Sequence, residues 1–134
     1  MKVNSFYPVL MTNTVEQDAE FYSKYLAFNK TYSSDWYISL IDAYDNELAI
    51  LDVNHETVPH GFAKTTSGVI LNIEVENVDE VYQSLISSKE SKIVLDMKIE
   101  EFGQKHFIIA GPNNILIDII EVIPATGEYV GNYE

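Results

Sequence analysis

Few side chains in this sequence could carry out acid–base or metal chemistry. The segment His55-Glu56-Thr57-Val58-Pro59-His60 looks like a zinc-protease signature, but its two histidines are five residues apart instead of four. Pro59 also prevents the helix that would align them, so we interpret both histidines as loop residues. Without cysteine, a Gly-x-Ser-x-Gly motif or a glycine-rich phosphate loop, the sequence gives no support for covalent catalysis or nucleotide binding.

Asp118 interrupts residues 115–120, a run that is otherwise apolar on both faces and is therefore typical of a central strand. A bare carboxylate there is costly, so it must accept hydrogen bonds, meet a cation or stay protonated. Asp118 either contacts a structural partner, such as a tyrosine or lysine of this chain, or faces a pocket where it binds an amine or moves a proton. His106, in another expected strand, either lines the pocket or caps the sheet edge.

The charge balance limits the possible partners. The 134 residues include 21 acidic side chains against eight lysines and no arginine, which gives a net charge of −13. This argues against nucleic acid and strongly anionic ligands. The acidic residues either only keep the surface soluble or make the pocket prefer cations. No window approaches about 20 unbroken apolar residues and no signal peptide is evident, so we expect a cytoplasmic protein that does not enter a membrane.

The elements that must position these residues form two copies of one unit. In the first copy they are a strand at Val9–Thr12, a helix from Thr14 to about Phe28, and strands at residues 30–32, 36–41 and 47–53. In the second they are a strand at residues 69–75, a helix beginning after Asn77, and strands at residues 93–99, 105–110 and 115–122. Thr14 and Gln17 have the spacing of a capping box, and Asn77 with Glu80 repeats it.

The order of these elements predicts an α+β fold made of two pseudo-symmetric βαβββ modules that form curved mixed sheets around a pocket. The expected boundaries are about residues 3–55 and 68–123 for the modules, 56–67 for a connector and 124–134 for a tail. The tail is either a loose arm or a contact with a second subunit. Each module has one helix to cover one sheet face, so the other face must be covered by the partner module, another subunit or a ligand.

Several short motifs, in this order, resemble the vicinal oxygen chelate superfamily, which includes glyoxalase I, extradiol dioxygenases, fosfomycin-resistance enzymes and bleomycin-resistance proteins. They are Tyr7-Pro8-Val9-Leu10, Ala19-Glu20-Phe21-Tyr22, Leu26-Ala27-Phe28, and Phe102-Gly103-Gln104-Lys105-His106-Phe107 before Gly111-Pro112-Asn113-Asn114. Enzymes of this family bind one divalent metal at four positions, which fall here on Pro8, Ile50, Ile70 and Asp118. An internal repeat, with offsets of 62 and 68 residues, pairs Pro8 with Ile70 and Ile50 with Asp118.

Because only Asp118 could bind a metal, the resemblance implies the metal-free branch, of which bleomycin-resistance proteins are the known example. It implies a protein that binds a cationic or amphipathic small molecule, uses no cofactor, has no assigned catalytic residue and forms a homodimer. The expected ligand-pocket residues are Trp36, Ile50, Ile70, Phe102, His106 and Asp118. Trp36 could instead belong to the core. The alternatives are a lyase, isomerase or dioxygenase-like enzyme of the same superfamily, or a protein-interaction module.

Overall fold

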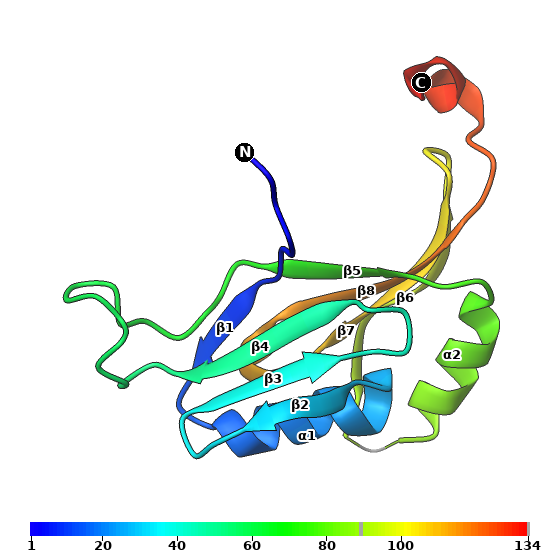
Figure 1. Cartoon of the computed structure of the whole chain (residues 1–134). Coiled ribbons are helices and arrows are strands. Elements are labelled where there is room, and N and C mark those ends of the chain that lie inside the picture. The colour runs from blue at the N-terminus through cyan, green and yellow to red at the C-terminus, as the bar shows by residue number, and fades with distance from the viewer. Residues whose placement is uncertain (89, 134) are drawn as a thin grey trace. The chain divides into compact units, whose positions relative to one another are not determined.

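The computed structural model describes residues 1–88 and 90–133. It divides the chain into two compact units, Met1–Ser67 and Gly68–Glu134, which we call the first and second units. Each unit contains one four-stranded mixed sheet, and neither sheet is closed (Figure 1). The α+β fold predicted from the sequence is therefore confirmed. No helix in the described part of the chain is long and apolar enough to cross a membrane.

The first unit has the predicted order of one strand, one helix and three strands. Its elements are β1 (Val9–Thr12), α1 (Val15–Leu26), β2 (Asn29–Ser33), β3 (Tyr37–Ile41) and β4 (Glu47–Asp52). The strands lie in the order β1-β4-β3-β2, with β1 and β4 parallel and the other pairs antiparallel. A parallel pair needs a long crossover, and α1 with the two strands that follow it supplies this connection.

Alternation along the strands of the first unit buries one sheet face beneath α1. Leu10, Ile38, Leu40 and Ile50 occupy alternate strand positions, are all buried, and belong to the unit's core. The helix contributes Ala19 and Tyr22 at helical spacing to the same core. The helix ends at Ala27, whose left-handed backbone, with φ 59°, turns the chain toward β2.

The capping boxes predicted from the sequence differ between the two helices. Thr14 does not cap the N-terminus of α1, because its hydroxyl donates instead to Asp18 Oδ1 over 2.7 Å. Asn77 does cap the second helix, since its side-chain oxygen accepts from Glu80 N over 3.2 Å. The spacing of a capping box alone therefore does not show which way a threonine hydroxyl turns.

The second unit repeats the order of the first. Its elements are β5 (Ile70–Glu74), α2 (Val78–Ile86), β6 (Lys92–Glu100), β7 (Gln104–Ala110), the 3₁₀-helix η1 (Pro112–Asn114), β8 (Leu116–Val122) and the 3₁₀-helix η2 (Gly127–Asn132). The strand order is β5-β8-β7-β6, with β5 and β8 parallel. Strand β8, which carries Asp118, lies between two neighbours, and the prediction of a central strand is confirmed.

The two faces of the second sheet differ in character. One faces α2, because the rings of Tyr82 and Phe107 pack edge to face with centroids 5.1 Å apart. Ile117 and Ile119 share that face and are buried. The opposite face carries His106 and Asp118, and we call it the His106 face.

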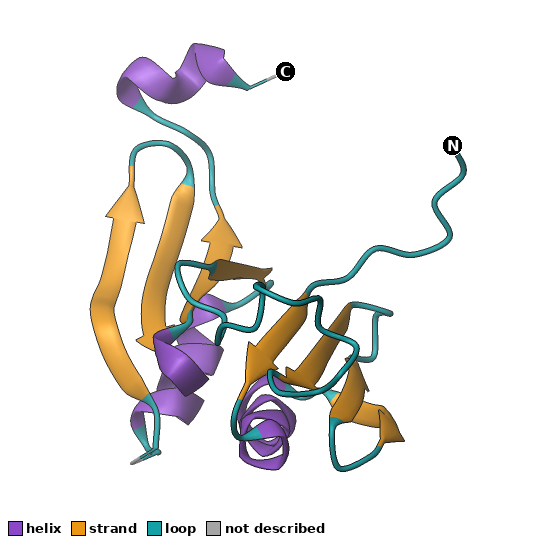
Figure 2. Ribbon diagram, turned by 90° about the vertical axis from the view of Figure 1, so that its left-hand side faces the viewer, coloured by secondary structure: helices purple, strands orange, loops and turns teal. Residues whose placement is uncertain are grey.

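The C-terminal tail is fastened to the second unit, and the prediction of a loose arm was wrong. Thr126 N donates to Glu101 O over 2.8 Å, and the Phe102 and Tyr129 rings pack edge to face at 5.8 Å. The Tyr133 hydroxyl donates to the Phe102 carbonyl. Figure 2 shows the terminal helix above the turn that joins β6 and β7. The tail lacks helical periodicity, so these contacts, all to one turn, could not be predicted from the pattern of its residues.

Candidate functional site

His106 lies between two carboxylates on the His106 face. Its Nδ1 is 2.7 Å from Asp118 Oδ1, and its Nε2 is 2.9 Å from Glu100 Oε2. His106 is 4% exposed and Asp118 is 8% exposed, so this polar contact is almost completely removed from water. Buried polar groups of this kind are costly unless they are paired, and here each nitrogen of the ring has a partner.

Strand register brings these three side chains together. His106 on β7 stands opposite Ile120 on β8 and opposite Lys98 on β6. A residue two positions from a direct partner lies on the same sheet face and is a diagonal neighbour. Those diagonal neighbours of His106 are Asp118 on one side and Glu100 on the other.

Lys98 completes this group, because its ammonium lies 3.2 Å from Glu100 Oε1. We call His106, Asp118, Glu100 and Lys98 the His106 cluster. A neutral imidazole has a single N–H donor, whereas an imidazolium has two. Two ionised carboxylates at the two ring nitrogens therefore indicate an imidazolium. Two positive groups then balance two negative groups.

The pKa values of the cluster agree with this pairing. Burial acts to lower the pKa of His106, but the hydrogen bonds to Glu100 and Asp118 outweigh it, and the pKa is raised above its ordinary 6.5. The pKa of Glu100 is lowered from its ordinary 4.5, mainly because it accepts a hydrogen bond from His106, with Lys98 adding to the effect. Both shifts favour the charged forms of the pair.

Asp118 keeps one oxygen free within the described part of the chain. Oδ1 is bonded to His106, whereas Oδ2 has no hydrogen-bond partner among residues 1–88 and 90–133. In that part of the chain, the Tyr22 hydroxyl is the side-chain polar atom that is both fully buried and without a hydrogen-bond partner. Asp118 Oδ2 also has no partner but is not in this class, so it is not fully buried. Strand β8 thus presents one hydrogen-bond acceptor on the His106 face, beside Leu116 and Ile120.

The other pocket residues proposed from the sequence lie in different places. Ile70 on β5 is opposite Leu116, on the His106 face, and is 56% exposed. Phe102 lies in the turn between β6 and β7, where its ring contacts Tyr129. Trp36 belongs to the first unit, where its ring stacks on His55 with centroids 3.6 Å apart and planes within 4°.

Ile50 does not occupy the position in the first unit that matches Asp118. It pairs with Leu10 and Ile38, and all three are buried on the face beneath α1. Asp118 lies on the face opposite α2. The repeat offset of 68 residues inferred from the sequence is therefore wrong by one, because a shift of one residue moves a strand side chain to the other face.

The residues at the family's metal positions do not fit a divalent ion. Pro8 and Ile70 have no side-chain ligand atoms, and Ala49 and Leu51, to which a shift of one residue moves the position assigned to Ile50, have none either. The ring nitrogens of His106 both face carboxylates, so neither offers a lone pair. Among the residues that the structure describes, no group of three or more histidine or acidic side chains is arranged so that it could hold a metal ion.

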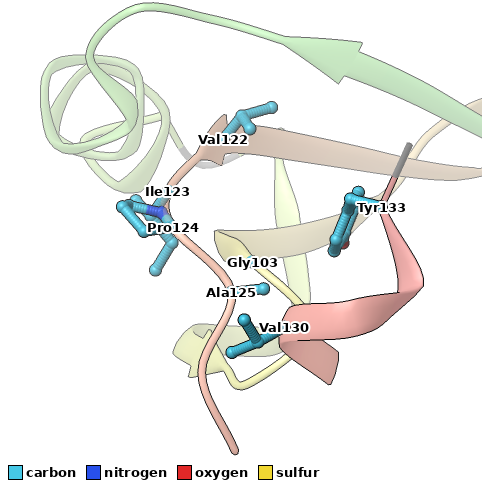
Figure 3. Close-up of a pocket in the computed structure, with 7 residues that line it drawn as sticks. All are labelled: Gly103, Val122, Ile123, Pro124, Ala125, Val130 and Tyr133. Carbon is cyan, nitrogen blue, oxygen red and sulfur yellow. The ribbon is translucent and has the colours of Figure 1, made fainter. Parts of the chain in front are cut away.

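A pocket of about 320 Å³ lies where the C-terminal tail meets the second sheet. It is lined by Gly103, Val122, Ile123, Pro124, Ala125, Val130 and Tyr133. Figure 3 shows that these residues come from the β6–β7 turn, the end of β8, the segment after it and the terminal helix. Its lining holds no charged side chain, so it supplies no acid–base chemistry.

Glu100 and Lys98 are the residues of the His106 cluster that sequence reasoning missed. The expected strand ended at residue 99, one residue short of Glu100. Register shifts in β6, between Ile93 and Leu95 and between Leu95 and Lys98, also change which side chains share a face. One sequence signal could have found both residues. Lys98 and Glu100 are two positions apart, on either side of Ile99, which places two opposite charges on one strand face just before the turn.

No family model matches the sequence, and no curated protein matches it. Solved structures do. A glyoxalase/bleomycin resistance protein/dioxygenase from Nocardioides is 15% identical with a TM-score of 0.76, covering 96% of this chain and 89% of that one. An enzyme of the same description from Burkholderia phytofirmans PsJN is 17% identical with a TM-score of 0.73, covering 87% and 97%. The bleomycin resistance determinant encoded on transposon Tn5 is 16% identical with a TM-score of 0.64, covering 90% and 98%.

Proposed function

We propose that this chain, which has the fold of glyoxalase/bleomycin-resistance/dioxygenase proteins, binds an amphipathic small molecule on the His106 face and does not transform it. One observation carries the proposal. Asp118 Oδ2 is an acceptor without a partner in the described chain, on a central strand between the apolar side chains of Leu116 and Ile120. A ligand with an apolar body and a hydrogen-bond donor matches that arrangement.

The chemistry of the site supports binding over metal-dependent catalysis. With the position of Ile50 shifted by one residue to Ala49 or Leu51, three of the four metal positions of the family enzymes still lack a ligand atom, and His106 is held at both nitrogens. A general base needs a nitrogen that faces the substrate, and this ring has none free. The similarity in fold to a bleomycin resistance determinant supports the same choice. We also propose that the chain forms a homodimer.

A thermal-shift and calorimetry experiment tests the function directly. Metal-free bleomycin is the first probe, followed by neutral and cationic amphipaths, all in the presence of chelator. A ligand that binds only the folded state at a hundred times its dissociation constant adds about 2.7 kcal/mol to the free energy of unfolding. Mass spectrometry of the recovered probe then shows whether it has been altered.

The matched variants are Asp118→Asn and Asp45→Asn. Both remove one carboxylate, but Asp45 is an exposed loop residue of the first unit with a left-handed backbone that asparagine tolerates. We expect Asp118→Asn to weaken binding and Asp45→Asn to leave it unchanged. Chemical change in a recovered probe would favour the enzyme alternative. If no probe binds, or if both variants bind as the wild type does, the proposed function is wrong.

A further inference from the structure

We infer that the His106 cluster makes the site select neutral hydrogen-bond donors over cations, with His106 and Glu100 as positioning and specificity-determining residues. The inference rests on the proposed function and names the ligand class. The net charge of −13 by itself leaves open a preference of the pocket for cations. The local arrangement around Asp118 points the other way.

A ligand at Asp118 would meet a carboxylate that is already paired with a positive charge. Asp118 carries one negative charge, and the His106 ring lies 2.7 Å from it. The ring is a doubly donating imidazolium, because its other nitrogen is 2.9 Å from Glu100. A cation at Asp118 Oδ2 would be attracted by the carboxylate and repelled by the imidazolium bonded to the other oxygen, Oδ1, so the imidazolium offsets part of the attraction. The cost of removing an ammonium group from water then favours a neutral donor.

The charged groups around the His106 ring come from strands β5, β6 and β8. Strand β6 contributes Lys98 and Glu100, which neutralise each other at 3.2 Å. Strand β8 contributes Asp118. Glu74 on β5 stands opposite Ile120, on the His106 face, but it is exposed to solvent, which screens its charge. No group among these leaves a net negative charge at the exposed oxygen of Asp118.

Hydrogen bonding at Asp118 also favours a neutral donor. Asp118 Oδ2 can still accept a hydrogen bond, and leaving a nearly buried carboxylate oxygen unpaired costs free energy. A hydroxyl or amide N–H satisfies this oxygen without bringing a second positive charge beside the imidazolium. Glu100 holds the ring from the other side, so it positions His106 and thereby fixes the oxygen that a ligand can reach.

The ligand test uses two probes that differ only in charge, 4-phenylbutan-1-ol and 4-phenylbutylammonium, measured by calorimetry at neutral pH. Wild-type protein should bind the alcohol more tightly. His106→Asn keeps a neutral donor to Asp118 but removes the positive charge, so ammonium binding should strengthen by about tenfold relative to the alcohol. Glu100→Gln keeps the imidazolium and removes a negative charge, so relative ammonium binding should weaken. If His106 and Glu100 had a purely structural role, the two variants would not change relative ammonium binding in opposite directions.

A second readout needs no ligand. Nitrogen-15 NMR of the His106 ring at pH 7 should show both nitrogens protonated. A neutral tautomer, or tighter ammonium binding by the wild type, would overturn the inference. Failure of both probes to bind to any variant, with the ring still doubly protonated, would instead locate the error in the proposed function and remove the inference with it.

Discussion

The backbone of Gly103 lies directly against that of Ile123. Ile123 N donates to Gly103 O over 2.9 Å, and a Cβ added to Gly103 would lie 2.9 Å from Ile123 O. Gly103 also has φ +107°, a conformation that side chains rarely adopt. We therefore expect Gly103→Ala to lower the free energy of unfolding by about 1–3 kcal/mol, measured by urea denaturation.

Gly61→Ala is the matched control for this substitution. Gly61 has φ +87°, but a Cβ there would meet nothing within 4 Å. Its variant carries the backbone strain without the clash, so the difference between the two variants measures the close approach to Ile123. Equal losses of stability would show that the contact between the β6–β7 turn and the tail is loose.

Tyr22 should be replaceable by phenylalanine with no loss of stability. Its side chain is 1% exposed, and its hydroxyl has no hydrogen-bond partner in the described part of the chain. Burial, together with the nearby charge of Asp18, raises the pKa of this hydroxyl far above its ordinary value, so it stays neutral. An unpaired buried hydroxyl costs roughly 1–3 kcal/mol, and Tyr22→Phe should recover part of this. If thermal denaturation shows that Tyr22→Phe unfolds at a lower temperature than the wild type, the hydroxyl has a partner.

Removing the charge of Asp118 should destabilise the second unit. Asp118→Asn keeps the volume but replaces a charged hydrogen bond to His106 with a neutral one. A hydrogen bond to a charged group is worth about 1.5–3 kcal/mol, and we expect a loss toward the lower end of that range. Urea denaturation of this variant and of Asp45→Asn makes the comparison. An unchanged midpoint for both would mean that the buried carboxylate is not part of the architecture.

The stability of the protein should depend on pH through His106 and Glu100. The pKa of His106 is raised, so its contribution is complete below about pH 6.5 and is lost as pH rises through the folded-state pKa. The pKa of Glu100 is lowered, so its contribution is present above about pH 4.5 and is lost as pH falls through the folded-state pKa. The cluster should therefore stabilise most between pH 4.5 and 6.5.

Urea midpoints measured across this range test the assignment. His106→Asn should flatten the alkaline side of the profile, and Glu100→Gln the acidic side. A variant profile that runs parallel to that of the wild type would mean that another group causes the slope.

The proposed homodimer predicts a mass of about twice 15.2 kDa by light scattering at micromolar concentration. Exposed apolar side chains such as Phe6, Ile99 and Val122 offer surface for such a contact. A single species of monomer mass across the micromolar range would contradict the proposal.

The fold could be predicted from the sequence because its signals are local. Short apolar runs at residues 37–41 and 116–122 mark strands, and the period of the apolar residues in α1 marks a helix. The strand that Asp118 interrupts lies between two neighbours, as its apolar sequence predicted. These features depend on side chains within one element, so one sequence is enough to find them.

The contacts within the site depend on register, which one sequence does not determine. Asp118 and His106 were both identified as candidates, but their pairing requires the turn at residues 111–115 to set Ala110 opposite Leu116. That turn contains Asn113 and Asn114, both at positive φ, and its length is not obvious from composition. Glu100 was missed for the same reason, because irregularities in β6 decide which of its side chains face β7.

Trp36, which stacks on His55, gives the protein an intrinsic fluorescent probe. Trp36 is the sole tryptophan of the chain and belongs to the first unit. Its emission therefore reports on that half alone, while far-ultraviolet circular dichroism reports on both halves. Coincident denaturation curves from the two signals would mean that the halves lose structure together, and separate curves would mean that one half persists without the other. No label has to be introduced to make that distinction.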